Sequence, residues 1–184
     1  MIDIMPTKIN GLSIIKLITH EDQRGKFNKV FSYNSSCALG LEFNIKQINT
    51  SQNFSIGQIR GMHFQKRPSL EKKMVRCISG KIYDVVVDLR SQSSTFLHWH
   101  GEILESGDLK MIHIPEGCAH GFQALEKNSE LIYLHSAEYD PSVESGIRYN
   151  DPIINVKWPL RAVKISERDK SFDLLDLTYS GIEV

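Results

Sequence analysis

Residues 81–90 read Lys-Ile-Tyr-Asp-Val-Val-Val-Asp-Leu-Arg, and this stretch decides the class of the fold. Apolar side chains recur at every second position from Tyr83 to Leu89. The two acids of the stretch, Asp84 and Asp88, fall between them. Because successive side chains of a strand point to opposite faces, this alternation predicts a β-strand with a different environment on each face.

Similar short runs, bounded by Gly, Asn, Asp or Pro, recur along the rest of the chain. They lie at residues 12–18, 27–33, 43–49, 59–65, 73–78, 95–104, 109–114 and 130–136. About nine or ten strands with few helical stretches are typical of a double-sheet jelly roll or a closed barrel. We therefore expect an all-β core.

Two short helices are expected beside this core. Residues 34–40 have a polar start and a glycine at the end. The second helix begins at Ser166, because Ser166 and Asp169 have the spacing of a capping box, and it continues toward Phe172 and Leu175.

Length and composition predict one globular domain over residues 1–184. The chain has 22 basic and 22 acidic residues, and zero net charge argues against a nucleic-acid partner and favours self-association. Its three cysteines include no Cys-x-x-Cys pair, which favours a reducing cytoplasm over a disulfide framework. No apolar run approaches the roughly 18 residues of a membrane span, so no membrane partner is expected.

Two histidines lie in segments with unusual combinations of residues. His63 belongs to Arg-Gly-Met-His-Phe-Gln at 60–65, and His120 belongs to Ile-Pro-Glu-Gly-Cys-Ala-His-Gly-Phe at 114–122. A glycine inside a strand pattern lets backbone or a ligand approach closely. Together the two segments resemble the paired motifs of the cupin superfamily.

Departures from the metal-binding form of these motifs predict no bound metal. In metal-binding cupins the Pro-x-Gly-x-x-His motif, here Pro115, Gly117 and His120, supplies one ligand. The first motif here has Gln65 after His63 where a second histidine is expected, and lysines stand near its acid position. Zinc and iron sites need three good N, O or S ligands, so a metal-dependent oxygenase is disfavoured and no cofactor is expected.

Further segments narrow the resemblance from the superfamily to one family within it. They are 22–27, 47–49, 60–65, 73–76, 84–90, 114–122, Tyr133, Glu144, 150–152, 158–159 and 166–169. In this order they resemble the nucleotide-sugar 3,5-epimerase family of the cupins. The resemblance implies a double-stranded β-helix, or jelly roll, and an isomerase of deoxysugar biosynthesis. It would invert C3, C5 or both of a nucleotide-diphospho-4-keto-6-deoxy sugar, with dTDP-4-dehydro-6-deoxyglucose converted to dTDP-4-dehydrorhamnose as the leading expectation.

The resemblance also implies catalytic roles. The reaction removes a proton beside a ketone, holds an enolate and returns a proton from the opposite face. His63 would be the base, for which a neutral imidazole is suited, and Asp169 would pair with it. Tyr133 would return the proton. Lys73 would stabilise the enolate oxygen, in the way that oxyanion donors do.

Substrate-binding residues follow from the same resemblance. Arginine is suited to a diphosphate by its planar fork of donors. The predicted contacts are Arg24, Lys29, Gln47, Asn49, Arg60, His120, Glu144 and Arg168. On an ideal strand Arg60 points away from His63, so either a bulge near Gly61 or a partner chain must bring it into the site. The family also implies a homodimer in which an N-terminal strand joins the partner's sheet, so that residues 20–30 serve the neighbour's site.

Several alternatives stay open at this point. Lys29 stands where the family usually has a glutamate that contacts the nucleotide, so the base and the sugar are not determined. A C3-only epimerase or a 3,4-ketoisomerase on another nucleotide sugar would use the same base. A sugar-binding cupin without catalysis is the alternative from another class.

Overall fold

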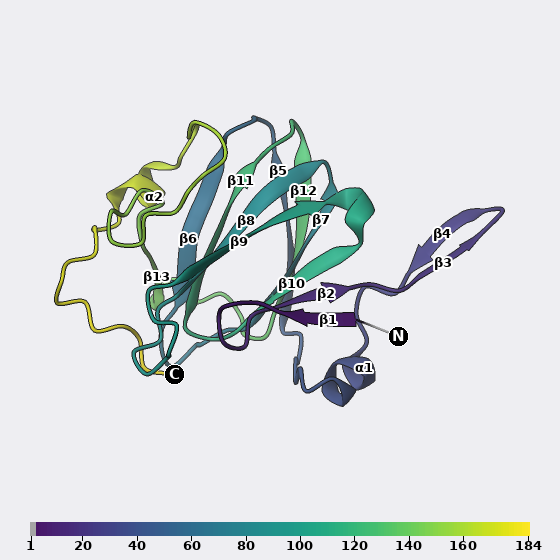
Figure 1. The fold of residues 1–184 in the computed structure, drawn as a ribbon, viewed down its shortest axis with the longest axis horizontal. Helices are drawn as coiled ribbons and strands as arrows, with labels where there is room; N and C mark the ends of the chain where they lie inside the picture. The colour runs from purple at the N-terminus through teal and green to yellow at the C-terminus, as the bar shows by residue number, and fades with distance from the viewer. Residues whose placement is uncertain (1–2) are drawn as a thin grey trace.

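The structure, a computed structural model that describes residues 3–184, is a sandwich of two antiparallel sheets (Figure 1). The first sheet has the order β1 (Asp3–Pro6), β2 (Ser13–Lys16), β10 (Lys110–Ile114), β7 (Lys73–Ser79), β12 (Ser129–His135), β5 (Gln47–Asn53). The second has the order β13 (Glu144–Gly146), β6 (Ile59–Gln65), β11 (Cys118–Ala124), β8 (Lys81–Asp88), β9 (Trp99–Glu105). The predicted all-β jelly roll is confirmed.

Strand β8 lies near the centre of the second sheet, between β11 and β9. On one face, Ile82 and Val86 are fully buried in the core between the two sheets. On the other face, Val85 and Val87 are also fully buried, under a cluster that includes residues of the C-terminal segment. The two faces predicted from the alternation are therefore both covered, and Asp84 has no exposed surface.

The helices are short, as expected. Helix α1 spans Tyr33–Ala38, η1 is a 3-10 turn at Ser106–Asp108, and α2 spans Glu167–Ser171. The Ser166 hydroxyl accepts a 3.0 Å hydrogen bond from the Asp169 N–H, so the predicted cap is present. Because α2 ends at Ser171, the apolar residues after it are not helical. No helix within residues 3–184 has the length and apolar character needed to cross a bilayer.

The strands differ from the sequence prediction in several places. Residues 95–98 are not in a strand, and β1, β3 and β13 were not predicted. Residues 29–32 are not in a strand, since β4 (Gly25–Asn28) ends before them and α1 follows. The strand expected over 43–49 begins only at Gln47. Strand β11 was not predicted because the Pro and Gly residues around it resemble a turn. Only residues 115–117 turn, and the small residues after them fit between β6 and β8.

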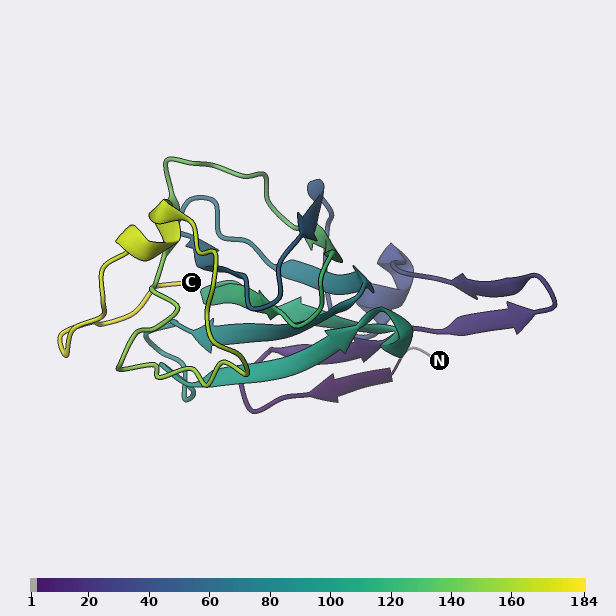
Figure 2. The same ribbon diagram turned by 90° about the horizontal axis from the view of Figure 1, so that it is seen from above.

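A separate hairpin, formed by β3 (Thr19–Asp22) and β4, extends away from the sandwich (Figure 2). The two strands pair only with each other among the described residues. Phe27 of β4 is 72% exposed. An apolar residue of this size on a projecting hairpin has no core of its own chain to pack against.

Candidate active site

A cleft of about 820 Å³ lies at one end of the sandwich and is lined by residues from both sheets. It brings together most of the residues that the sequence predicted. These are Gln47, Asn49, Arg60, His63, Lys73, His120, Tyr133, Glu144, Arg168 and Asp169. Residues separated by more than 100 positions in the chain therefore share one cavity.

A bulge in β6 places Arg60 and His63 on the same side. His63 pairs with His120 of β11, but Arg60 pairs with Phe122, so β6 has one residue more than β11 over this interval. An extra residue on one strand reverses the alternation locally. Gly61 lies in the bulge with φ of +115°, and a Cβ there would be 2.6 Å from the Cα of Gly121. The bulge therefore explains how Arg60 reaches the same side of β6 as His63 within one chain.

His63 forms a close pair with Asp169. Its Nε2 is 2.8 Å from Asp169 Oδ1, and the other carboxylate oxygen accepts a 3.0 Å hydrogen bond from the Gly61 N–H. Burial opposes ionisation of this carboxyl group, but the bonds from His63, Gly61 and Ser166 outweigh it and lower the pKa of Asp169 to about 2. Since an ionised carboxylate only accepts, Nε2 carries the hydrogen and the lone pair of the neutral ring is on Nδ1.

Arg168 also contacts the His63 ring. Its Nη2 is 2.9 Å from His63 Nε2, and its Nη1 donates to Glu144 at 2.6 Å. A neutral imidazole nitrogen either donates or accepts, so Asp169 and Arg168 are not both its hydrogen-bond partners. We assign Nε2 to the buried carboxylate, which is the stronger acceptor, and treat Arg168 as held by Glu144.

Tyr133 lies across the cleft on β12. Its hydroxyl is 3.0 Å from that of Ser51, and its ring packs edge-on against His120 with centroids 6.3 Å apart. Desolvation of the hydroxyl raises the pKa of Tyr133 well above its usual value. The phenol is therefore protonated and able to donate at neutral pH.

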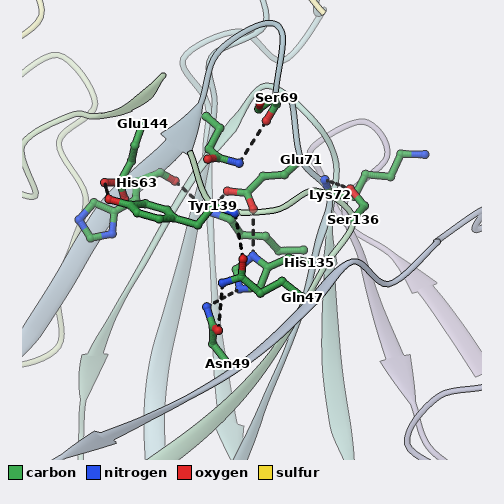
Figure 3. Close-up of polar contacts among 12 residues, drawn as sticks. Gln47, Asn49, His63, Ser69, Glu71, Lys72, His135, Ser136, Tyr139 and Glu144 are labelled. Atoms are coloured by element: carbon green, nitrogen blue, oxygen red, sulfur yellow. Dashed lines mark hydrogen bonds and ion pairs between the residues drawn. The ribbon is translucent and has the colours of Figure 1, made fainter. Parts of the chain in front are cut away.

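Lys73 points into the cleft from the start of β7, with its side chain 9% exposed. The adjacent Lys72 does not line the cleft, and its ammonium donates to the Glu42 carbonyl. The Lys73 ammonium is 2.9 Å from Glu71 Oε1 and 3.4 Å from the His63 carbonyl. Sequence reasoning missed Glu71, together with His135, which is 2.9 Å from its other oxygen (Figure 3).

His120 forms another imidazole–carboxylate pair, with Asp84 of β8. The distance from its Nε2 to Asp84 Oδ2 is 2.8 Å, and the two side chains are almost fully buried. Asp84 was also missed as a functional residue, because neither the strand alternation nor the resemblance of segment 84–90 assigned it a role. The pattern carried no signal that a partner was present in β11.

Two predicted contacts lie outside the cleft. Arg24 is in the turn of the β3–β4 hairpin, with its side chain 91% exposed and paired with Asp22 at 2.6 Å. Lys29 is exposed just after β4. Arg60, by contrast, is in the cleft, where its Nε donates to the Asn53 side chain at 2.9 Å, and it has no carboxylate partner within residues 3–184.

No three His, Cys, Asp or Glu side chains in residues 3–184 converge as metal ligands would. The cleft is lined by an imidazole with a free nitrogen, by a protonated phenol on the other sheet and by an ammonium. These are the groups needed to remove and return a proton beside a carbonyl. The fold and site are those of a cupin-type isomerase.

Comparison with known proteins identifies the family. The family model described as dTDP-4-dehydrorhamnose 3,5-epimerase matches residues 6–176. The chain belongs to this family. The epimerase of that name from Mycobacterium tuberculosis is 42% identical over 170 residues, covering 89% of this chain and 83% of the relative.

Solved structures agree in fold. The dTDP-4-dehydrorhamnose 3,5-epimerase of Bacillus anthracis, with TDP and PPi bound, has a TM-score of 0.92 at 31% identity and covers 95% of this chain and 100% of its own. The dTDP-6-deoxy-D-glucose-3,5-epimerase of Legionella pneumophila, in complex with dTDP-4-keto-L-rhamnose, has a TM-score of 0.91 at 34% identity, covering 97% and 95%.

Proposed function

We propose that the chain inverts C3 and C5 of dTDP-4-dehydro-6-deoxyglucose to give dTDP-4-dehydrorhamnose. The observation that carries the proposal is the His63–Asp169 pair facing Tyr133 across one cleft, in a chain of the epimerase family. The ligands of the Bacillus and Legionella enzymes support a thymidine nucleotide as the carrier. The reaction needs no external oxidant, since it only moves protons.

His63 is the base in this proposal. Asp169 accepts the Nε2 hydrogen and so fixes the tautomer that leaves Nδ1 free to take a proton from the sugar. The anionic carboxylate also stabilises the imidazolium that forms.

Tyr133 returns the proton from the opposite wall. Its phenol is protonated at neutral pH, and Ser51 orients the hydroxyl. After deprotonation of the sugar, negative charge lies on the C4 oxygen, where the Lys73 ammonium stabilises it. Two of the ammonium's three hydrogens are directed at Glu71 and the His63 carbonyl, which leaves one for the enolate.

The diphosphate needs cations that carry no carboxylate partner. Arg60 meets this need, with only an amide as its partner among the described residues. Gln47 and Asn49 line the cleft on β5 beside it and would contact the nucleotide. His120, held by Asp84, would contact the sugar or diphosphate, and Arg168 and Glu144 would close the opposite side.

We also propose a homodimer in which the β3–β4 hairpin of one chain serves the cleft of its partner. Arg24 and Phe27 are too exposed to act within their own chain, and a projecting hairpin has unpaired strand edges that a second copy would cover. Arg24, once released from Asp22, and Lys29, at the other end of the hairpin, would then contact the substrate in the partner's cleft.

Solvent exchange tests the chemistry. In D2O, the protein should place two deuterons in dTDP-4-dehydro-6-deoxyglucose, one each at C3 and C5, and fail with the corresponding CDP and GDP sugars. A single deuteron at C3 would instead identify a C3-only epimerase. His63→Ala should lower exchange about 10²- to 10⁴-fold, the usual contribution of a general base. Exchange in His63→Ala as fast as in the wild type would exclude His63 as the base.

A mixing experiment tests the dimer. Arg24→Ala and His63→Ala are each expected to be weakly active. If the hairpin acts in the partner's cleft, a mixed dimer contains one cleft with both an intact His63 and an intact Arg24. Unfolding and refolding the two variants together should therefore restore a fraction of the activity. Absence of any recovery in verified mixed dimers would place Arg24 in its own chain's site.

A further inference from the structure

Glu71 and His135 form a buried pair in the cleft that the reaction proposed above does not use. The Glu71 carboxylate lies between two partners, with Oε1 2.9 Å from the Lys73 ammonium and Oε2 2.9 Å from His135 Nδ1. The three side chains are 8%, 9% and 14% exposed for Glu71, Lys73 and His135. Charged groups at this depth are expensive unless paired, so the arrangement needs an explanation.

The strand register brings these groups together. His135 of β12 is directly opposite Lys73 of β7 on one side and Gln47 of β5 on the other. Residues opposite each other in adjacent strands project from the same face of a sheet. The row Lys73, His135 and Gln47 therefore crosses the floor of the cleft, and Glu71 is placed over it by the segment that precedes β7.

Hydrogen bonds continue from this pair along β5 (Figure 3). The His135 Nε2 is 3.4 Å from Asn49 Nδ2, and Asn49 Oδ1 accepts from Gln47 Nε2 at 3.0 Å. The Gln47 Oε1 accepts from the Tyr139 N–H at 2.9 Å. One continuous chain of contacts thus connects the Lys73 ammonium to the amide side chains of β5.

With a neutral His135 ring, one set of directions satisfies every hydrogen bond in this chain. Glu71 is ionised: burial opposes this, but the His135 bond and the Lys73 charge outweigh it and lower the pKa of Glu71. A carboxylate only accepts, so His135 Nδ1 carries the hydrogen and Nε2 accepts. Asn49 must then present its NH2 group to His135, and its carbonyl oxygen faces Gln47.

We propose that Glu71 and His135 are positioning residues, which hold the Lys73 ammonium and the Asn49 amide in fixed orientations for the keto sugar. The inference rests on the proposed function, in which Lys73 faces the enolate oxygen. Glu71 constrains one of the three ammonium hydrogens. His135 in turn fixes Glu71 and couples it to the strand that contacts the nucleotide.

Kinetics of two variants, measured beside the wild type, test the proposal. In Glu71→Gln the ammonium loses its anionic partner and its fixed position, so kcat for exchange should fall about 10- to 100-fold, the scale of a small misplacement of a catalytic group. KM should change less than about threefold. The alkaline limb of the pH–rate profile should move to lower pH. The matched control is Glu105→Gln, which removes the carboxylate from a partly exposed ion pair with Lys81 outside the cleft, and it should leave kcat and the profile unchanged.

His135 provides a second variant in which the ion pair stays intact. His135→Phe removes both hydrogen bonds of the ring and should lower kcat about tenfold. His135→Gln supplies a donor for Glu71 and an acceptor for Asn49, and it should recover most of that loss. Urea unfolding of each variant reports folding separately.

The outcomes separate this inference from the one on which it rests. If the wild type exchanges deuterium but Glu71→Gln matches it in kcat and pH profile, the pair serves stability alone and the inference is wrong. Equal activity of His135→Phe and His135→Gln would also contradict it. A wild type that shows no exchange overturns the proposed function, and this inference with it.

Discussion

The sandwich contains two imidazole–carboxylate pairs of the same length in very different surroundings. His63–Asp169 and His120–Asp84 both have 2.8 Å between Nε2 and a carboxylate oxygen. The imidazole of the first pair is 23% exposed and opens to the cleft, whereas that of the second is 6% exposed. A carboxylate partner alone therefore does not make a base; the ring also needs a nitrogen that the substrate can reach.

The two carboxylates differ in their own support as well. The Asp169 carboxylate accepts hydrogen bonds from His63 and from the Gly61 N–H, and the Asp169 backbone N–H donates to the Ser166 hydroxyl of the helix cap. Asp84 has one partner, and its Oδ1 is buried with no hydrogen bond within residues 3–184. The charge of Asp169 is thus stabilised by the fold, while that of Asp84 is poorly compensated.

The largest expected difference between the pairs is in catalysis. Asp169→Asn should lower kcat for deuterium exchange about 10³-fold, because an amide accepts the Nε2 hydrogen weakly and provides no charge for the imidazolium. It should also cost about 2 kcal/mol of unfolding free energy, from the depressed pKa of the carboxyl. Steady-state exchange and urea unfolding measure the two effects. A loss of stability with full kcat would show that the pair is structural.

The bulge that supports the first pair is the next point to test. Gly61→Ala puts a Cβ 2.6 Å from the Gly121 Cα at a φ of +115°, so we expect a loss of about 3 kcal/mol or more. The bulge would shift and carry Arg60 and His63 with it. Gly107→Ala is the control, since Gly107 has open space around it, and it should change stability by less than about 0.5 kcal/mol. Equal effects of the two substitutions would contradict the role of the bulge.

How well the sequence predicts this site depends on how far apart in the chain the interacting residues are. Most of the longer strands, the Ser166 cap and the cupin motifs are local patterns, and they were predicted from residues a few positions apart. The bulge at Gly61 arises from the close approach of β11, which no local pattern records. The pairs of Asp84 and Glu71 join residues 36 and 64 positions apart, so alternation along one strand gave no sign of either partner.

A smaller effect is expected at the second pair. Asp84→Asn removes a buried charge that has a single partner, so the unfolding free energy should change by less than about 1 kcal/mol. The reoriented His120 should weaken substrate binding, raising KM about three- to tenfold with little change in kcat. Initial-rate kinetics give both constants. A fall in kcat as large as that of Asp169→Asn would make the two pairs equivalent and remove the distinction between them.

The smallest expected difference between the two pairs is in the stability of the fold at acid pH. The carboxyl of Asp169 has its pKa lowered from 3.8 to about 2 by folding, so the stability it contributes is present above pH 4 and is lost as the pH falls toward 2. The wild type should lose about 2 kcal/mol from this group over that range. In His63→Ala the hydrogen bond that most lowers this pKa is absent, so the loss should shrink by about 1 kcal/mol. His120→Ala should leave the dependence due to Asp169 unchanged, because it does not contact that carboxyl. Urea midpoints of the three proteins, measured between pH 2 and 5, test this expectation. If the midpoints of the wild type and His63→Ala change equally with pH, the imidazole does not stabilise the Asp169 charge. The Gly61 backbone and the helix cap would then stabilise it.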